Sequence, residues 1–180
     1  MPGMLEFIHS QWRALPYPTQ SFEGQTVIVT GANVGLGLEA ARHFARLGAA
    51  KVILACRSIE KGQAAAESIV SSTNRNVCEV WQLDMEDFDS IKAFAKRAEG
   101  LERLDVVMAN AGVSMSEYTF SQKANMETTV AVNVVGTFLL ALLMMPILRK
   151  TGKKYSTVPH LTVTSSEVHA WVPMSSPIRK

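Results

Sequence analysis

The stretch QTVIVTGANVGLGLEAARHFARLG, residues 25–48, predicts a strand, a tight turn and a helix in immediate succession. Residues Gln25–Thr30 are rich in β-branched side chains, which favour a strand. Three glycines in the pattern Gly-x-x-x-Gly-x-Gly then precede apolar residues at helical spacing, and Gly48 marks the end of the helix. The expected apolar face consists of Leu36, Ala40, Phe44 and Leu47.

The glycine turn has the properties of a phosphate-binding loop. Gly31, Gly35 and Gly37 carry no Cβ atom, so the chain can turn tightly there. The free N–H groups at the start of the following helix, together with the helix dipole, suit a pyrophosphate. Such glycines can also serve only a tight turn. Between a buried strand and an amphipathic helix, however, they favour a dinucleotide site.

Strand and helix alternate through the rest of the chain, which predicts βαβ units and a parallel sheet. Right-handed crossovers would place helices on both faces, so the expected fold class is α/β, a Rossmann-like doubly wound sheet with five strands present. The further strands are expected at Lys51–Ala55, Val77–Gln82, Leu104–Ala109 and Leu161–Thr164. The further helices are expected at Ser58–Ser72 with Ser58 as N-cap, around Ile91–Ala98, and at Val130–Leu148.

Composition excludes several classes of protein. A chain of 180 residues that is 47% hydrophobic can bury the core of one domain and is too apolar to be disordered. The 18 Lys and Arg residues are interspersed with 16 Asp and Glu, so no nucleic-acid partner is expected. Only Cys56 and Cys78 are present, without an Asn-x-Ser/Thr sequon, which favours a reducing, cytoplasmic location. The sequence predicts no metal site.

The expected organisation is a lead-in at residues 1–24, a dinucleotide-binding domain at 25–170 and an unstructured tail at 171–180. The lead-in lacks a secretory signal, although Met4–Trp12 could form a short amphipathic helix. Residues Thr128–Leu148 carry no charge and are numerous enough to span a bilayer. Because this segment contains Asn133 and Pro146 between amphipathic elements, a buried core helix is the preferred interpretation. A membrane anchor remains the alternative.

The end of the second strand suggests which dinucleotide is bound. An acidic residue there accepts hydrogen bonds from the adenosine ribose, whereas an arginine accommodates a 2′-phosphate. This chain has Arg57 and, one turn later, Lys61, with no acid beside them. NADP(H) is therefore the expected cofactor, although both residues could be solvated surface charges.

Several motifs appear in order along the chain, each near a strand end or in the long helix. They are TGANVGLG (30–37), Leu83-Asp84, Asn110-Ala111-Gly112, Asn133 and Ser165-Ser166. With them the chain resembles the short-chain dehydrogenase/reductase superfamily, in particular retinol-dehydrogenase-like members of filamentous fungi. The resemblance extends from about Pro16 to Trp171.

The resemblance implies a role for each motif. The backbone around Asn33, Gly35 and Leu36 would hold the phosphates and ribose of the cofactor, Asp84 would meet the adenine, and Asn110 would line the cleft. Asn133 would anchor a water in a proton relay, and a serine of the Ser165/Ser166 pair, by motif position Ser166, would hydrogen-bond a substrate carbonyl. From the residues alone, Asp84 could instead be a helix N-cap, Asn110 a turn residue, Asn133 a satisfied core residue and the serines part of a loop.

The family's catalytic pair, Tyr-x-x-x-Lys, is absent from the sequence. The residues four positions after Tyr17, Tyr118 and Tyr155 are Ser, Gln and Pro. The sequence stops about where the helix bearing this pair should begin, so we expect a truncated form. Loss of general acid–base help alone lowers a rate by about 10²–10⁴. We further expect an uncovered apolar face on the Val130–Leu148 helix, open to a homo-oligomer.

Four functions follow in order of preference. The first is an NADP(H)-dependent oxidoreductase for a small-molecule carbonyl or alcohol, impaired by loss of the Tyr–Lys pair. The second is a non-catalytic dinucleotide-binding fragment, and the third a membrane-anchored protein. An acyl-transfer enzyme using Ser166 and His169 is the fourth, but no Gly-x-Ser-x-Gly elbow supports it.

Overall fold

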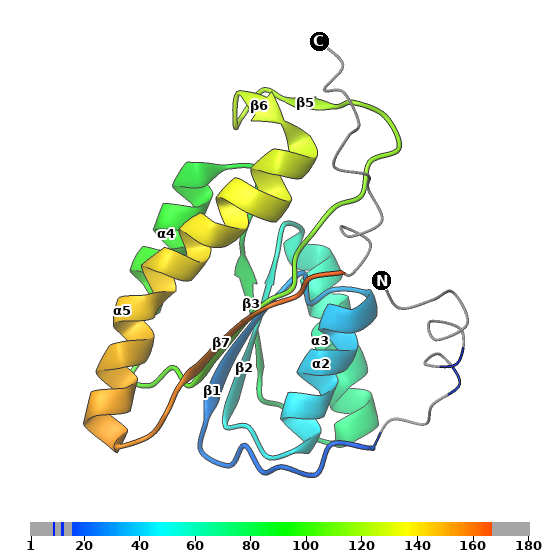
Figure 1. Ribbon diagram of the computed structural model, residues 1–180. Coiled ribbons are helices and arrows are strands. Elements are labelled where there is room, and N and C mark those ends of the chain that lie inside the picture. The colour runs from blue at the N-terminus through cyan, green and yellow to red at the C-terminus, as the bar shows by residue number, and fades with distance from the viewer. Residues whose placement is uncertain (1–8, 10–11, 13–15, 167–180) are drawn as a thin grey trace.

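The computed structural model describes residue 9, residue 12 and residues 16–166. Within them five parallel strands form one sheet in the order β3-β2-β1-β4-β7, with helices on both faces (Figure 1). The predicted Rossmann-like α/β class is thereby confirmed. The strands are β1 (Thr26–Thr30), β2 (Lys51–Cys56), β3 (Cys78–Gln82), β4 (Val106–Ala109) and β7 (His160–Val163). The helices are α2 (Gly35–Arg46), α3 (Ile59–Thr73), α4 (Phe88–Ala98), the π-helical η1 (Val130–Gly136) and α5 (Thr137–Tyr155).

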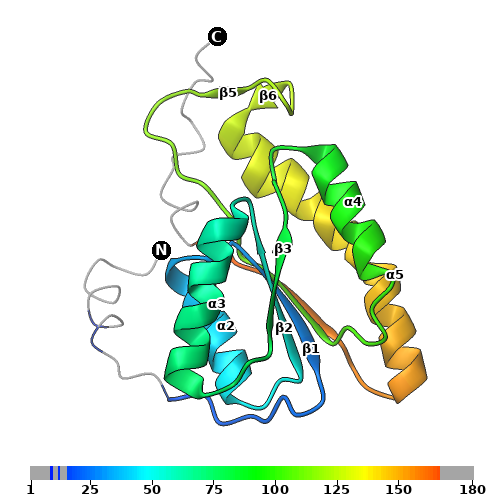
Figure 2. The same ribbon diagram turned by 180° about the vertical axis from the view of Figure 1, so that it is seen from behind.

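The core has two layers, one on each face of the sheet, and β1 contributes to both. Side chains alternate along a strand, so Val27 and Val29 pack on one face under α2 and α3, whereas Ile28 packs on the other under α4 and α5. Figures 1 and 2 show these two helix pairs from opposite sides. Because both faces are covered, every residue of β1 is buried, as a central parallel strand requires.

The buried face of α2 agrees with the prediction only in part, because Phe44 packs against the core but Leu36 does not. Gly37, Ala41 and Ala45 face the sheet, whereas Leu36 is 75% exposed. Small residues allow the helix axis to approach the strands closely. The face of α2 with the smallest side chains is therefore buried, although larger apolar side chains lie elsewhere on the helix. In α4, by contrast, the predicted face Ile91, Phe94, Ala95 and Ala98 is buried throughout.

The chain between β4 and α5 was the least predictable part. The expected single helix Val130–Leu148 begins as the π-helical turns of η1 and continues to Tyr155. Thr137 Oγ1 donates to the carbonyl oxygen of Val132, five residues earlier. A two-stranded antiparallel hairpin, β5 (Phe120–Ser121) and β6 (Met126–Glu127), precedes η1 and was not predicted. Strands this short carry no periodic signal in a sequence.

The continuous helix Val130–Tyr155 is long and apolar enough to cross a membrane by length and composition. It packs against α4 and the sheet, and 44% of its most apolar window is buried inside the protein. A core helix has these same properties. The predictions for His169 and for the tail 171–180, and for Met4–Trp12 apart from residues 9 and 12, concern residues outside those described.

Candidate functional site

A cleft of about 300 Å³ lies where the strands of the sheet end. Open α/β sheets bind their ligands at this carboxyl edge. Five of the residues proposed from sequence line the cleft, one or more from each of four strand ends: Gly31, Asn33, Arg57, Asp84 and Asn110. The remaining cofactor candidates of the glycine turn, Gly35, Leu36 and Gly37, form the first turn of α2 beside it. Lys61 lies on α3, exposed, and does not contribute to this lining.

The glycine turn needs its glycines for two separate reasons. Gly31 and Gly35 have φ values of +65° and +59°, in the left-handed region that other residues avoid. Gly37 has an ordinary φ, but a Cβ there would lie 2.6 Å from Asn110 Nδ2 and closer still to the carbonyl oxygen of Gly31. The turn and the helix start therefore fit together only without side chains, and this leaves backbone open to the cleft.

The amino end of α2 is free to receive an anion. Its N-cap residue, Val34, makes no side-chain hydrogen bond to the helix. Helix α3 is capped by Ser58, which accepts from the Lys61 N–H, and α4 is capped by Asp87. The positive end of the α2 dipole thus lies beside the cleft, and no side chain at the N-cap accepts from its free N–H groups. Such a helix end suits the phosphates of a dinucleotide.

Asn110 ties three strand ends together beside the cleft. The backbone N–H groups of Asn110 and Ala111 both donate to Thr30 Oγ1 at 2.9 Å. The Asn110 side chain donates from Nδ2 to the Thr30 carbonyl oxygen at 3.1 Å and accepts from Thr164 Oγ1 at 3.4 Å. The segment after β4 is therefore held firmly against the glycine turn and the end of β7.

Asp84 is not the N-cap of α4, an alternative that the sequence left open. Asp87 holds that position and accepts from the N–H groups of Asp89 and Ser90. Asp84 instead accepts from the Glu86 N–H at 3.1 Å and from Lys123 Nζ at 2.6 Å, with its side chain only 12% exposed. The carboxylate of Asp84 raises the pKa of the Lys123 ammonium, since it favours the charged form.

Arg57 has an acidic neighbour that the sequence did not reveal. Its guanidinium lies 3.5 Å from Glu86 Oε1 across the cleft wall, and its side chain is 72% exposed. Glu86 is itself held by Ser121, whose hydroxyl donates to Glu86 Oε2 at 3.0 Å. Both Arg57 and Glu86 line the cleft.

The three residues proposed for catalysis lie apart from the cleft lining. Asn133 in η1 makes a reciprocal pair of hydrogen bonds with the backbone of Val113, each 2.8 Å long. Its side chain is exposed, so the alternative of a core residue is wrong, but it does fix a residue that lines the cleft. Ser165 and Ser166 follow β7 and are exposed on the same edge of the sheet.

Cys56, in the cleft, and Gly136, which packs against the loop that borders it, are two residues that the sequence did not single out. Cys56 lines the cleft, and burial raises the pKa of its thiol, which is therefore protonated at neutral pH. Gly136 lets η1 reach the loop after β3, because a Cβ there would lie 2.5 Å from the Met85 carbonyl oxygen. Over residues 9, 12 and 16–166, no group of three or more His, Cys, Asp or Glu is arranged to hold a metal ion.

Comparison with known proteins identifies relatives of this chain. A family model described as short chain dehydrogenase matches residues 25–159. The short chain dehydrogenase/reductase dmxR8 of Cryptosporiopsis sp. (strain 8999) is 48% identical over 167 residues, which cover 91% of this chain and 51% of that protein. The chain spans about half the length of the curated relatives it matches.

Two solved structures resemble the chain and contain a dinucleotide. A short-chain dehydrogenase from Sphingobium yanoikuyae in complex with NADPH is 25% identical, with a TM-score of 0.67 over 80% of this chain and 54% of that chain. A metagenomic short-chain oxidoreductase in complex with NADP is 28% identical, with a TM-score of 0.65 over 88% of this chain and 67% of that chain.

Proposed function

Because the chain belongs to the short-chain dehydrogenase family, we propose that it binds NADP(H) in the cleft at the carboxyl ends of its strands. The whole protein would be an oxidoreductase for a small-molecule carbonyl or alcohol. The observation that carries the proposal is the glycine cradle at the uncapped start of α2, beside the Arg57 guanidinium. A cytoplasmic location is part of the same proposal.

Each part of the cleft has a task in this function. The backbone of the glycine turn and the start of α2 would receive the pyrophosphate, and Arg57 would receive the 2′-phosphate. Asp84 and its neighbours would border the adenine, while Asn110 keeps the cleft wall in place. When bound, NADP(H) supplies or accepts a hydride. Asn133, Ser165 and Ser166 remain proposed contributors to substrate and proton handling.

Arg57 offers a direct test of the preference for NADP(H). The Arg57→Gln variant should bind NADPH roughly tenfold more weakly or worse, because a charge-assisted bond to the 2′-phosphate is lost. Its affinity for NADH should not fall, since NADH lacks that phosphate. Calorimetric titration of both nucleotides gives the two constants, with Arg149→Gln as control because Arg149 is exposed on α5, outside the cleft. Equal losses for both nucleotides would contradict the assignment.

A binding function without turnover is a second candidate, and the tyrosines favour it. Tyr155 is four residues before Pro159, and its hydroxyl donates to Glu102 at 3.0 Å, near the amino ends of β4 and β7. Tyr118 is four residues before Gln122 and 77% exposed on the loop after β4. A phenol transfers protons near neutral pH only when its pKa is lowered, and no lysine stands at that spacing. NADPH binding with no carbonyl reduction supports this candidate, whereas turnover refutes it.

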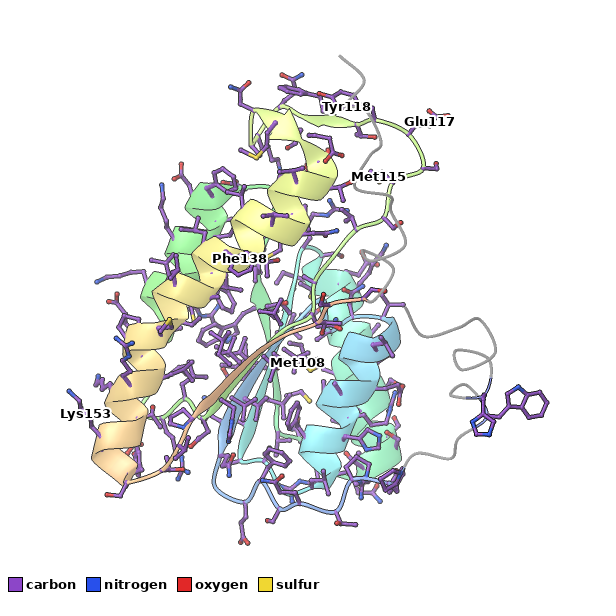
Figure 3. The ribbon with its side chains drawn as sticks, in the orientation of Figure 1. Met108, Met115, Glu117, Tyr118, Phe138 and Lys153 are labelled. Carbon is purple, nitrogen blue, oxygen red and sulfur yellow. The ribbon has the colours of Figure 1, made fainter. Side chains whose placement is uncertain are left out.

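An exposed apolar stripe runs along η1 and α5, and we propose that it pairs with a second copy of the chain. The stripe consists of Val130, Val134, Phe138, Leu142 and Met145. Glu127 accepts from the N–H groups of Thr129 and Val130 at the start of η1, whereas Lys153 lies in the last turn of α5 (Figure 3). Antiparallel pairing of two copies would bring the basic end of each helix to the acidic end of the other, and would place opposed helix dipoles side by side.

Substitution at the centre of the stripe tests the pairing. The wild-type chain should sediment as a dimer or larger, and Phe138→Asp should sediment as a 19.7 kDa monomer, because a charge in an apolar interface is not tolerated. Val158→Asp is the matched control, since Val158 is 77% exposed but lies outside the stripe. A monomeric wild-type chain would refute the proposal.

A further inference from the structure

Glu86 is the acidic residue closest to Arg57 in the cleft, and it comes from a different part of the chain. Arg57 follows β2, whereas Glu86 lies on the loop between β3 and α4. Both line the cleft, and Glu86 Oε1 lies 3.5 Å from Arg57 Nη1. The tertiary fold thus supplies at the end of β2 the acid that is missing from that position of the sequence.

The Glu86 carboxylate is held in place more firmly than its basic partner. Its side chain is 23% exposed, against 72% for Arg57. The hydroxyl of Ser121, a residue that is 4% exposed, donates to Glu86 Oε2 at 3.0 Å, and Ser121 is in turn fixed by the Ala124 N–H. The negative charge therefore stays at the cleft wall, while Arg57 is free to swing toward a ligand.

We propose that Glu86 is a specificity-determining residue that opposes the 2′-phosphate of NADP(H) and so narrows the difference in affinity between NADPH and NADH. It acts in two ways. Arg57 must leave Glu86 before it can pair with the phosphate, and the fixed carboxylate then repels the phosphate as a like charge. NADH has no phosphate at this position, and its ribose hydroxyls can donate to a carboxylate.

The inference rests on the proposed NADP(H) site, and one set of titrations tests both. Glu86→Gln removes the charge but keeps an oxygen that can accept from Ser121, so the fold of the β5–β6 hairpin is preserved. In the full chain this variant should bind NADPH roughly three- to tenfold more tightly, as expected for removal of one nearby like charge. Its affinity for NADH should stay the same or fall.

Asp89→Asn is the matched control, because Asp89 lies just beyond the same loop, is exposed and does not line the cleft. It should change neither affinity. If the wild type binds NADPH but Glu86→Gln leaves the ratio of NADPH to NADH affinity unchanged, the inference is wrong and the proposed function stands. If neither nucleotide binds to the wild type or to the variant, both are wrong.

Discussion

Replacing Gly37 by alanine should weaken NADPH binding strongly and destabilise the fold. The added Cβ would lie 2.6 Å from Asn110 Nδ2, which is held by the Thr30 carbonyl oxygen, and closer still to the backbone carbonyl oxygen of Gly31. Because the contacts are with backbone and with a fixed amide, they cannot relax cheaply. Overpacking of this kind costs about 1–3 kcal/mol of unfolding free energy. A distorted turn should weaken NADPH binding by at least roughly tenfold.

Gly100→Ala is the control for this prediction. A Cβ at Gly100 would meet only the Arg97 carbonyl oxygen at 3.4 Å, at the edge of ordinary contact, and the residue has no positive φ. Thermal unfolding and calorimetric titration of both variants compare the effect of a methyl group at an unconstrained glycine with its effect at Gly37. The difference in stability and in NADPH affinity is then due to the close contacts at Gly37. Unchanged binding by Gly37→Ala would show that the turn tolerates a side chain and does not cradle phosphate.

Replacing Asp105 by alanine should destabilise the protein far more than replacing an exposed charged residue does. The Asp105 side chain is 4% exposed, accepts from the Thr26 N–H at 2.9 Å and pairs with Arg103 Nε at 2.7 Å. Its removal leaves a buried backbone donor and a largely covered guanidinium without their acceptor. Losses of this kind cost about 2–4 kcal/mol, which is measured as the shift in free energy of urea unfolding.

Asp89→Ala removes an ion pair of similar geometry from the surface. The Lys92 Nζ–Asp89 Oδ1 distance is 3.0 Å, but the two side chains are 63% and 90% exposed. Solvent screens such pairs, so the expected loss is below about 0.5 kcal/mol. Comparable losses for Asp105→Ala and Asp89→Ala would mean that β1 and β4 do not depend on this buried carboxylate.

The fold was predictable because its signals are local and repeated. Each of the five strands shows a short apolar or β-branched run, and α3 begins at the predicted cap, Ser58. Most of the observed element boundaries differ from the predicted ones by one or two residues. The face of α2 was predicted only in part, because small residues, Gly37, Ala41 and Ala45, bring the helix close to the sheet, and this packing depends on the partner surface.

Some of the residues that line the cleft could be predicted, because they too are marked by local signals at the ends of strands. Gly31, Asn33, Arg57, Asp84 and Asn110 each follow a strand, and in a parallel sheet all strand ends meet at one edge. Asn133 shows the limit of this reasoning. Its two hydrogen bonds to Val113 join residues on separate elements, so no pattern within either element indicates them.

By itself, the sequence determined which elements form, their order and the chemistry presented at each strand end, because periodicity, turn residues and caps act over a few residues. Only the tertiary structure decided which of those groups meet. It placed Glu86 beside Arg57, Asp105 beneath Thr26 and Asn110 against Thr30, pairs separated by 29, 79 and 80 positions in the chain. Such contacts depend on how whole elements pack, which is why they appear only once the sheet is assembled.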